Sequence, residues 1–520
     1  MKKTLILCIT LILLVFSAAT ANANESVMTM HVGSGDSAIT YTSVPNTQEM
    51  LGPECFCLRS NGGFYLLDTA KSRVISFNAN GERDGIYQIP SDLSVAKITA
   101  RTGDQLYLLD LSKGIIATVE AGKLAKYQVQ DLLLDALIDF GVTESGAPFV
   151  SLADVKGGMS YIFKLAGDQA IIVDTKGGRI AGNGKLYKTT LIKDSSCSIG
   201  HACKVSIYDF NGKLENEITI QSDNWIEGAV YLGEEDNNIV IKTHESESDP
   251  NNVYFKDIVK KFDKKGILKE ISVLPNKYMY VQNDTLMKGS EMYHLNTGKN
   301  KVSIDKLTFL SPASNIDLNP LKASSFSPAS VTSTLPYVNR SLIQSTVVSY
   351  WQVSWYCSQS NYNTTSGSVR PRYITSPNAN YQCVPYCWGA YDTLTGFQSR
   401  QQSGTTCGNI GAFVAATCGV DCSGYVQRCW GINDAKHDTT YLDGSNISYR
   451  IAASSLKYGD AWNSTNHIMI YHYNDGYGNY VLYEATELNN CDRVAHTTRT
   501  VSSVQSGYHS IRRCNVTEDV

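Results

Sequence analysis

The chain has 520 residues, of which 42% are hydrophobic, 18% charged and 10% aromatic, and its formal net charge is −4. This balance is typical of globular proteins and excludes a disordered chain or a glycine-repeat fibre. A nucleic-acid partner is also disfavoured, because proteins that bind one carry a concentrated positive charge. The last 200 residues hold 25 charged side chains and the first 320 hold 69, which indicates two regions of different construction.

Residues 1–23 have the pattern of a secretory signal peptide. Lys2 and Lys3 precede an apolar run from Leu5 to Phe16 and a stretch of small residues that ends at Ala23. The alternative is an N-terminal membrane anchor, but the run is shorter than the roughly 20 residues that a spanning helix needs. We therefore expect a secreted or periplasmic protein with no stable membrane insertion once the signal is removed.

Short strands recur along residues 24–310. Phe64–Asp68 and Arg73–Phe77 form a predicted hairpin, and Gln105–Asp110 and Ile115–Val119 repeat the pattern about 40 residues later. This is the period of a β-propeller, in which each blade buries its faces only against its neighbours. The stretch from Gly52 to Phe77 also resembles a repeat of the NHL type. We predict an all-β propeller of about six blades; the alternative is a β-sandwich with a smaller β domain.

A propeller implies no chemistry by itself, since most propellers serve as binding platforms or spacers. A glycan or a protein is the expected kind of ligand. Residues 311–335 are rich in Ser, Pro, Ala and Asn without a sustained period, which is typical of a linker. Residues 336–520 then form the second domain, and its segment 341–355 carries apolar residues at helical spacing.

The chain has 14 cysteines, and one of them, Cys8, lies in the signal sequence. An odd number therefore remains for an oxidising compartment, where all but one of them can pair. Cys197 and Cys203 are close enough to close a small loop. Metal binding is disfavoured because no Cys or His pair with zinc spacing accompanies Cys383 and Cys387. We expect disulfides, no metal site and no cofactor.

Cys422 is the leading candidate for a nucleophile. It lies in Asp421-Cys-Ser-Gly424, a predicted tight turn followed by residues at helical spacing. Backbone N–H groups and the positive end of the dipole at the start of a helix stabilise a thiolate. The alternative is that Cys422 is one more half-cystine.

A base and its partner follow in the expected order. His467 begins a predicted strand, and Glu484 lies on the next strand after the turn at 474–478. A thiolate nucleophile needs an imidazole to share its proton, and the imidazole needs an acceptor to fix its orientation. His472 would point to the opposite face of its strand, which excludes it as the base. The remaining C-terminal histidines are expected at the surface: His437, His496 and His509.

Four motifs in order carry a family resemblance, namely Val384-Pro-Tyr-Cys-Trp-Gly389, Asp421-Cys-Ser-Gly-Tyr-Val426, Leu456–Asp460 with Asn466-His467, and Tyr483-Glu-Ala485. Through them the last ~185 residues resemble the NlpC-type family of papain-like cell-wall endopeptidases, which implies an α+β fold. The resemblance implies Cys422 as nucleophile and His467 as base. Peptidoglycan stem peptides, cut next to γ-D-glutamyl residues, are the implied substrates.

The same resemblance implies a pocket for the free amino end of the substrate, lined by Tyr386, Asp421 and Ser423, with Trp388 in the same motif. The other interpretation of Asp421 is a turn-forming or N-cap residue.

Two departures from the family pattern stand out. Glu484 occupies a position that is usually His, Asn or Gln, although related CHAP amidohydrolases are similar in using Glu; Asn489 is the substitute orienter. The stretch between Trp388 and Asp421 is longer than the family loop, and a bridge between its two cysteines, Cys407 and Cys418, would make it a stapled flap beside the cleft.

The sequence therefore predicts a secreted cysteine amidohydrolase with a Cys422–His467–Glu484 triad. The alternative is a binding protein whose propeller recognises a surface ligand while the papain-like domain is inactive. A third hypothesis keeps the same dyad but directs it at substrates outside the cell wall, such as host proteins or lipids.

Overall fold

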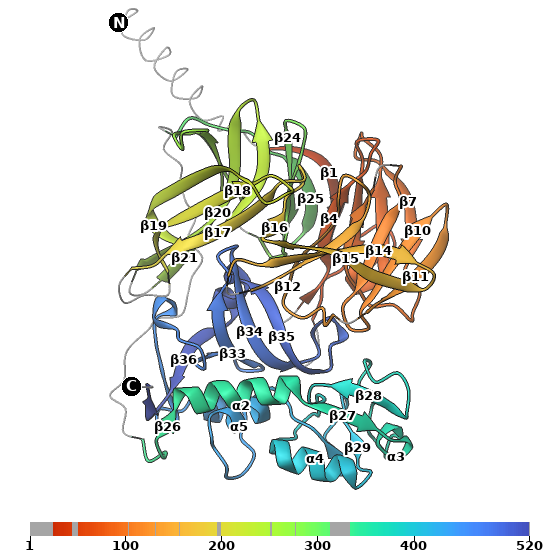
Figure 1. Ribbon diagram of the computed structural model, residues 1–520, viewed down its shortest axis with the longest axis vertical. Coiled ribbons are helices and arrows are strands. Elements are labelled where there is room, and N and C mark those ends of the chain that lie inside the picture. Colours follow the sequence, from red (N-terminus) through yellow and green to blue (C-terminus); the bar gives the residue numbers. More distant parts are fainter. Residues whose placement is uncertain are drawn as a thin grey trace, which may run out of the picture.

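The computed structural model describes residues 24–43, 50–101, 103–130, 132–154, 156–194, 199–249, 252–275, 277–312 and 333–518. The predicted signal peptide, most of the predicted linker and Cys197 lie outside these residues. None of the helices in the described ranges is long and apolar enough to cross a membrane. The described chain is mostly β-structure, with helices confined to the C-terminal part (Figure 1).

The N-terminal part is a β-propeller whose strands fall into six groups of four. Three groups are consecutive meanders: β4 (Pro53–Leu58), β5 (Phe64–Asp68), β6 (Arg73–Phe77) and β7 (Arg83–Gln88); β8 (Val95–Ala100), β9 (Leu106–Asp110), β10 (Ile115–Glu120) and β11 (Lys123–Val129); and β12 (Leu137–Val142), β13 (Pro148–Leu152), β14 (Met159–Ala166) and β15 (Gln169–Gly177). The first strands of these groups, β4, β8 and β12, lie side by side, as expected for the inner strands of neighbouring blades. The hairpin predicted at 64–77 is confirmed residue for residue.

The next two groups share one long strand. They are β16 (Arg179–Ile180), β17 (Leu186–Ile192), β18 (Gly200–Tyr208) and the first half of β19 (Leu214–Glu235), then the second half of β19 with β20 (Asn238–Asp249), β21 (Asn252–Asp263) and β22 (Leu268–Val273). The last group closes the ring, because the N-terminal strand β1 (Glu25–His31) pairs with β25 (Lys301–Lys306), beside β24 (Glu291–Thr297) and β23 (Thr285–Lys288). A short ladder of β2 (Thr42–Ser43) and β3 (Met50–Leu51) flanks it.

The C-terminal part packs helices on one antiparallel sheet. The sheet order is β31 (Ser448–Arg450), β36 (His509–Arg513), β32 (Ala461–Asn463), β33 (Ile468–Asn474), β34 (Asn479–Thr486) and β35 (Arg493–Thr500). Helices α2 (Arg340–Gln352) and α5 (Cys422–Cys429) contact each other, and α5 also contacts β33 and β34. Figure 1 shows this sheet between the helices and the propeller.

Smaller elements complete this part: β26 (Val338–Asn339) paired with β37 (Val516–Thr517), β27 (Ser354–Cys357) with β28 (Ala379–Gln382), β29 (Thr406–Cys407) with β30 (Thr417–Cys418), helices α3 (Gln359–Tyr362), α4 (Leu394–Gln402), α6 (Thr439–Leu442) and α7 (Val501–Gly507), and single turns at Thr69–Lys71, Ala453–Ser455 and Leu488–Asn490. The helix expected at 341–355 is shorter than predicted, because Val353 is extended and Trp355 lies in β27. Its buried face is formed by Ile343, Val347 and Tyr350, whereas Leu342 is exposed.

The β33–β34 hairpin inserts into the propeller. Tyr477 at its tip is buried, its hydroxyl donates to the Gly157 carbonyl, and Arg179 lies 5.0 Å from its ring centre. A side chain on Gly228 would collide with the backbone of Gly478, so this close approach requires glycine at 228. The hairpin therefore docks the C-terminal sheet against the propeller.

Asp135 of the propeller makes a further contact between the two parts. Its carboxylate pairs with Arg493 (3.0 Å) and accepts a hydrogen bond from the Trp351 indole N–H (2.7 Å). Both partners belong to the C-terminal part, on β35 and α2. The arrangement fixes the position of α2 and β35 relative to the propeller.

The disulfides expected from the cysteine count are not present among the described residues, where every cysteine is a free thiol. The sulfurs of Cys407 and Cys418 lie 3.4 Å apart across the β29–β30 pair, which is close but not bonded. These thiols behave as small apolar side chains: Cys357, Cys407, Cys418 and Cys429 all lie in the core of the C-terminal part.

Candidate active site

Helix α5 places Cys422 at its first position. Asp421 is the N-cap, and its Oδ1 accepts the Gly424 N–H at 2.7 Å, which fixes where the helix begins. The helix packs its Tyr425 and Val426 into the core, so the sulfur lies at the buried end of a rigid element. Cys422 itself is 8% exposed.

His467 lies at the entry to β33 and contacts two of the predicted partners. Its Nε2 is 2.7 Å from Oε2 of Glu484, and its ring is hydrogen-bonded to the Cys422 side chain. The predicted strand begins one residue later, at Ile468, because the His467 N–H donates to the Ser464 hydroxyl instead of a strand neighbour. The structure thus brings Cys422, His467 and Glu484 together.

Glu484 is held by a cluster that the sequence did not reveal. Arg499 donates from Nε to Oε1 (3.0 Å) and from Nη2 to Oε2 (2.6 Å), and the Thr497 hydroxyl donates to Oε1. Thr497 and Arg499 lie two residues apart on β35, the strand paired with β34, so both reach the same face as Glu484. An arginine and a threonine at alternate positions beyond the Glu-containing strand are the only sequence signal that could have identified them.

The electrostatics favour an ionised site. Burial opposes a charged imidazole, but hydrogen bonds and charge attraction from Cys422 and Glu484 outweigh it and raise the pKa of His467 to about 10. For Glu484 burial also opposes ionisation, yet the charges of Arg499 and His467 hold its pKa well below the ordinary range. A protonated His467 beside an ionised Glu484 is therefore the favoured state near neutral pH.

Two predicted substrate-binding residues have partners within the chain. Lys436 lies 3.1 Å from Oδ1 of Asp421 and donates to the Ser423 hydroxyl at 2.5 Å, while Oδ2 of Asp421 accepts the Gly389 N–H. Ser423 also donates to the His437 carbonyl at 2.9 Å. Asp421 is therefore an N-cap and an ion-pair partner, and a substrate ammonium would have to displace Lys436.

Tyr386 and Trp388 lie on the approach to α5. Tyr386 is buried in the same core cluster as Cys422. Burial, followed by the neighbouring Cys422, raises the pKa of the Tyr386 phenol well above its ordinary value. Trp388 is half-buried against the core, and its backbone N–H donates to the Asn409 carbonyl at 2.8 Å.

The remaining candidates lie elsewhere. Asn489 lines a cavity between the two parts of the molecule, while His467 takes Glu484 as its acceptor. His472 hydrogen-bonds His496 at 3.0 Å. The expectation that His496 is a surface residue is wrong, because its ring stacks on Tyr483 at 4.1 Å beneath Trp351. No group of three His, Cys, Asp or Glu side chains in the described ranges is arranged to hold a metal ion.

The chain was compared with known proteins. No protein-family model matches it, and no curated protein matches it. Among solved structures it is similar to hydrazine synthase of Kuenenia stuttgartiensis (13% identity, TM-score 0.32, covering 48% of this chain and 76% of that one).

It is also similar to virginiamycin B lyase of Staphylococcus aureus (11% identity, TM-score 0.29, covering 52% and 99%) and to the RRP9 WD40 repeats (11%, TM-score 0.31, covering 55% and 99%). TM-scores this low do not establish a fold, and the sheet order described above is the basis for the propeller.

Proposed function

We propose that the protein is a secreted or periplasmic cysteine hydrolase of the papain-like, NlpC-type class, acting on peptide bonds of peptidoglycan stem peptides. The observation that supports it most directly is the chain of contacts from Cys422 through His467 to Glu484, with Arg499 anchoring the carboxylate. The four motifs in family order supply the substrate class. A helix–sheet arrangement with the nucleophile at the start of α5 agrees with the same class.

The reaction follows from the charges. The Cys422 thiolate attacks an amide carbonyl carbon, and the resulting oxyanion is held by backbone N–H groups of the first turn of α5, which have no partner within the helix. His467 gives its proton to the leaving amine as the C–N bond breaks, which leaves a thioester. Water then gives a proton to His467, attacks the thioester and releases the acid and the thiolate. Glu484 stays ionised and orients the imidazole.

Digestion of purified muropeptides by the mature protein, followed by mass spectrometry, tests the proposal. Wild-type protein should cleave stem peptides, and Cys422→Ala should lose about 10⁴-fold or more, as nucleophile deletions do in such triads. Cys429→Ala is the matched control, because Cys429 is also a buried cysteine of α5 but points into the core. Cleavage that survives in Cys422→Ala, or that is absent in wild type, would contradict the proposal.

A second candidate function is a binding protein with a silent hydrolase domain. The ion pair between Lys436 and Asp421 favours it, since that pair occupies the predicted site for the substrate amino group. A thiol-reactive probe separates the two candidates. An active site should label Cys422 far faster than free cysteine at neutral pH, whereas a silent domain should not.

A further inference from the structure

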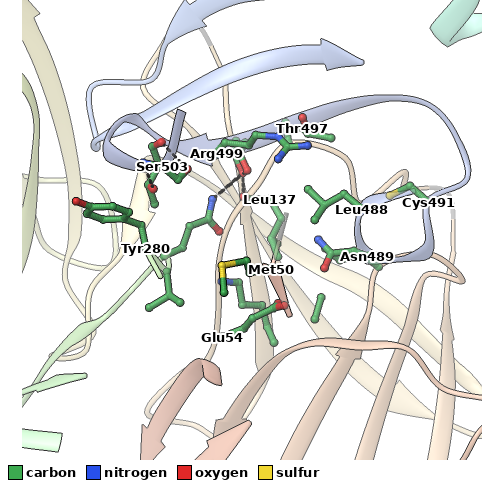
Figure 2. Close-up of a pocket in the computed structure, with 18 of the residues that line it drawn as sticks. Met50, Glu54, Leu137, Tyr280, Leu488, Asn489, Cys491, Thr497, Arg499 and Ser503 are labelled. Atoms are coloured by element: carbon green, nitrogen blue, oxygen red, sulfur yellow. Dashed lines mark hydrogen bonds between the residues drawn. The ribbon is translucent and has the colours of Figure 1, made fainter. Parts of the chain in front are cut away.

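A cavity of about 330 Å³ separates the propeller from the C-terminal sheet. This volume lies at the lower end of the roughly 300–1,000 Å³ that small-molecule pockets span. Leu488 and Asn489 reach it from the C-terminal part, opposite Met50 and Glu54 of the propeller (Figure 2). The cavity does not include Cys422, His467 or Glu484, but it borders the candidate active site, because Thr497 and Arg499 of its wall also hold Glu484.

Most of the lining is apolar or aromatic, which gives the cavity a body that can hold a hydrocarbon or aromatic group. Met50, Leu137 and Leu488 form part of the wall in Figure 2, and Tyr280 and Tyr508 add aromatic surface. The apolar groups come from both parts of the molecule. A ligand that fills the cavity would contact the propeller and the sheet at once.

Some of the charged side chains that line the cavity are held by hydrogen bonds or ion pairs, and Lys97 is not. Asp135 is paired with Arg493, Arg499 with Glu484, and Glu54 accepts a hydrogen bond from the Thr69 hydroxyl at 3.0 Å. Lys97, on inner strand β8, makes neither a hydrogen bond nor an ion pair with any other described residue, although it is only partly exposed. Its charge acts at longer range on the Asp139 carboxyl, where it partly offsets the rise in pKa that burial causes, but no carboxylate of the described residues contacts the ammonium directly. An ammonium group that borders a largely apolar cavity and has no direct partner can bind an anionic ligand.

Asn489 supplies a second unengaged polar group. Its side-chain amide has no hydrogen bond within the described part of the chain, and its backbone is left-handed (φ 50°), a conformation that Asn tolerates better than most residues. The amide N–H is a donor for a carboxylate. A cation and an amide donor in one apolar cavity form the usual recognition set for an organic acid.

We propose that this cavity is a binding site for a small organic carboxylate with an apolar or aromatic body, bound through Lys97 and Asn489. The site goes beyond the proposed hydrolase function and does not depend on it. Binding is therefore measured on the mature Cys422→Ala protein, so that absence of hydrolysis and absence of binding are separate results.

The experiment compares N-acetylphenylalanine with its amide by isothermal titration calorimetry. The acid should bind at least tenfold more tightly than the amide, because only the acid provides a carboxylate. Lys97→Met and the near-isosteric Asn489→Asp should each remove this preference while leaving the affinity for the amide unchanged. Asn489→Asp also keeps the left-handed backbone accessible, so it tests the site even if Lys97→Met fails to fold.

Lys123→Met is the matched control, because Lys123 is an exposed lysine of β11 outside the cavity. It should bind acid and amide like the parent protein. Equal affinity for the two probes, no measurable binding of the acid, or a preference that persists in both cavity variants would overturn the proposal.

Discussion

Replacing Glu484 by Gln removes one charge from the buried cluster with little change in shape. His467 loses a charged partner, and a hydrogen bond to a charged group contributes about 1.5–3 kcal/mol. One pKa unit corresponds to about 1.4 kcal/mol. The pKa of His467, about 10 in the wild-type protein, should therefore fall by about one to two units in Glu484→Gln.

The same substitution should lower stability. Arg499, with its side chain 9% exposed, would become a buried cation without its carboxylate, and removing one partner of a buried pair costs about 3–5 kcal/mol. The pH dependence of this loss of stability follows from His467, because its pKa in the folded protein lies above the ordinary value of 6.5. Its stabilisation is fully present below pH 6.5 and is lost as the pH rises through about 10. The difference in free energy of unfolding between wild type and Glu484→Gln should therefore become smaller above that pH.

NMR titration of the mature protein with labelled histidine measures the pKa of His467 directly, and the pH dependence of cleavage gives an independent value. In the wild type the alkaline limb should lie near pH 10, where the imidazolium that protonates the leaving amine is lost. Glu120→Gln, an exposed glutamate of β10, is the control for loss of one charge. An unchanged titration of His467 in Glu484→Gln would refute the reasoning.

Three further predictions concern the contact between the two parts of the molecule. Tyr477→Ala should lower the free energy of unfolding by about 3–5 kcal/mol, because a buried aromatic side chain is lost from the docked hairpin; thermal unfolding and limited proteolysis report it, and a wild-type profile would contradict it. Asp135→Asn should cost about 3–5 kcal/mol by leaving buried Arg493 unpaired, whereas the exposed Asp168→Asn should be neutral in the same melts. Burial raises the pKa of Glu227 to about 7, above its ordinary 4.5, so ionising it opposes folding as the pH rises from 4.5 to 7. The melting temperature of Glu227→Gln relative to wild type should therefore increase between pH 5 and pH 8, and a constant difference would contradict this.

The strands and the order of the candidate triad were accessible from sequence because they depend on local signals. The strands at 64–68 and 73–77 follow from short apolar runs with alternating faces, and α5 follows from the N-cap Asp421 and the helical spacing after it. Helix α2 shows the limit of periodicity: its apolar spacing continues to Trp355, but the chain leaves the helix after Gln352 to pair β27 with β28. Pairing between strands is a long-range interaction that spacing along the chain does not encode.

The sequence by itself determined which residue types have the chemistry for hydrolysis and in which order they occur. Only the tertiary structure decided that Arg499 anchors Glu484, that Lys436 pairs with Asp421, and that the cysteines of the described ranges are unbonded thiols. These contacts join residues brought together by the register of β34 and β35, by the loop after α5, and by the docking of the sheet on the propeller. Such distances depend on how separate elements pack, so composition and local spacing contain no information about them.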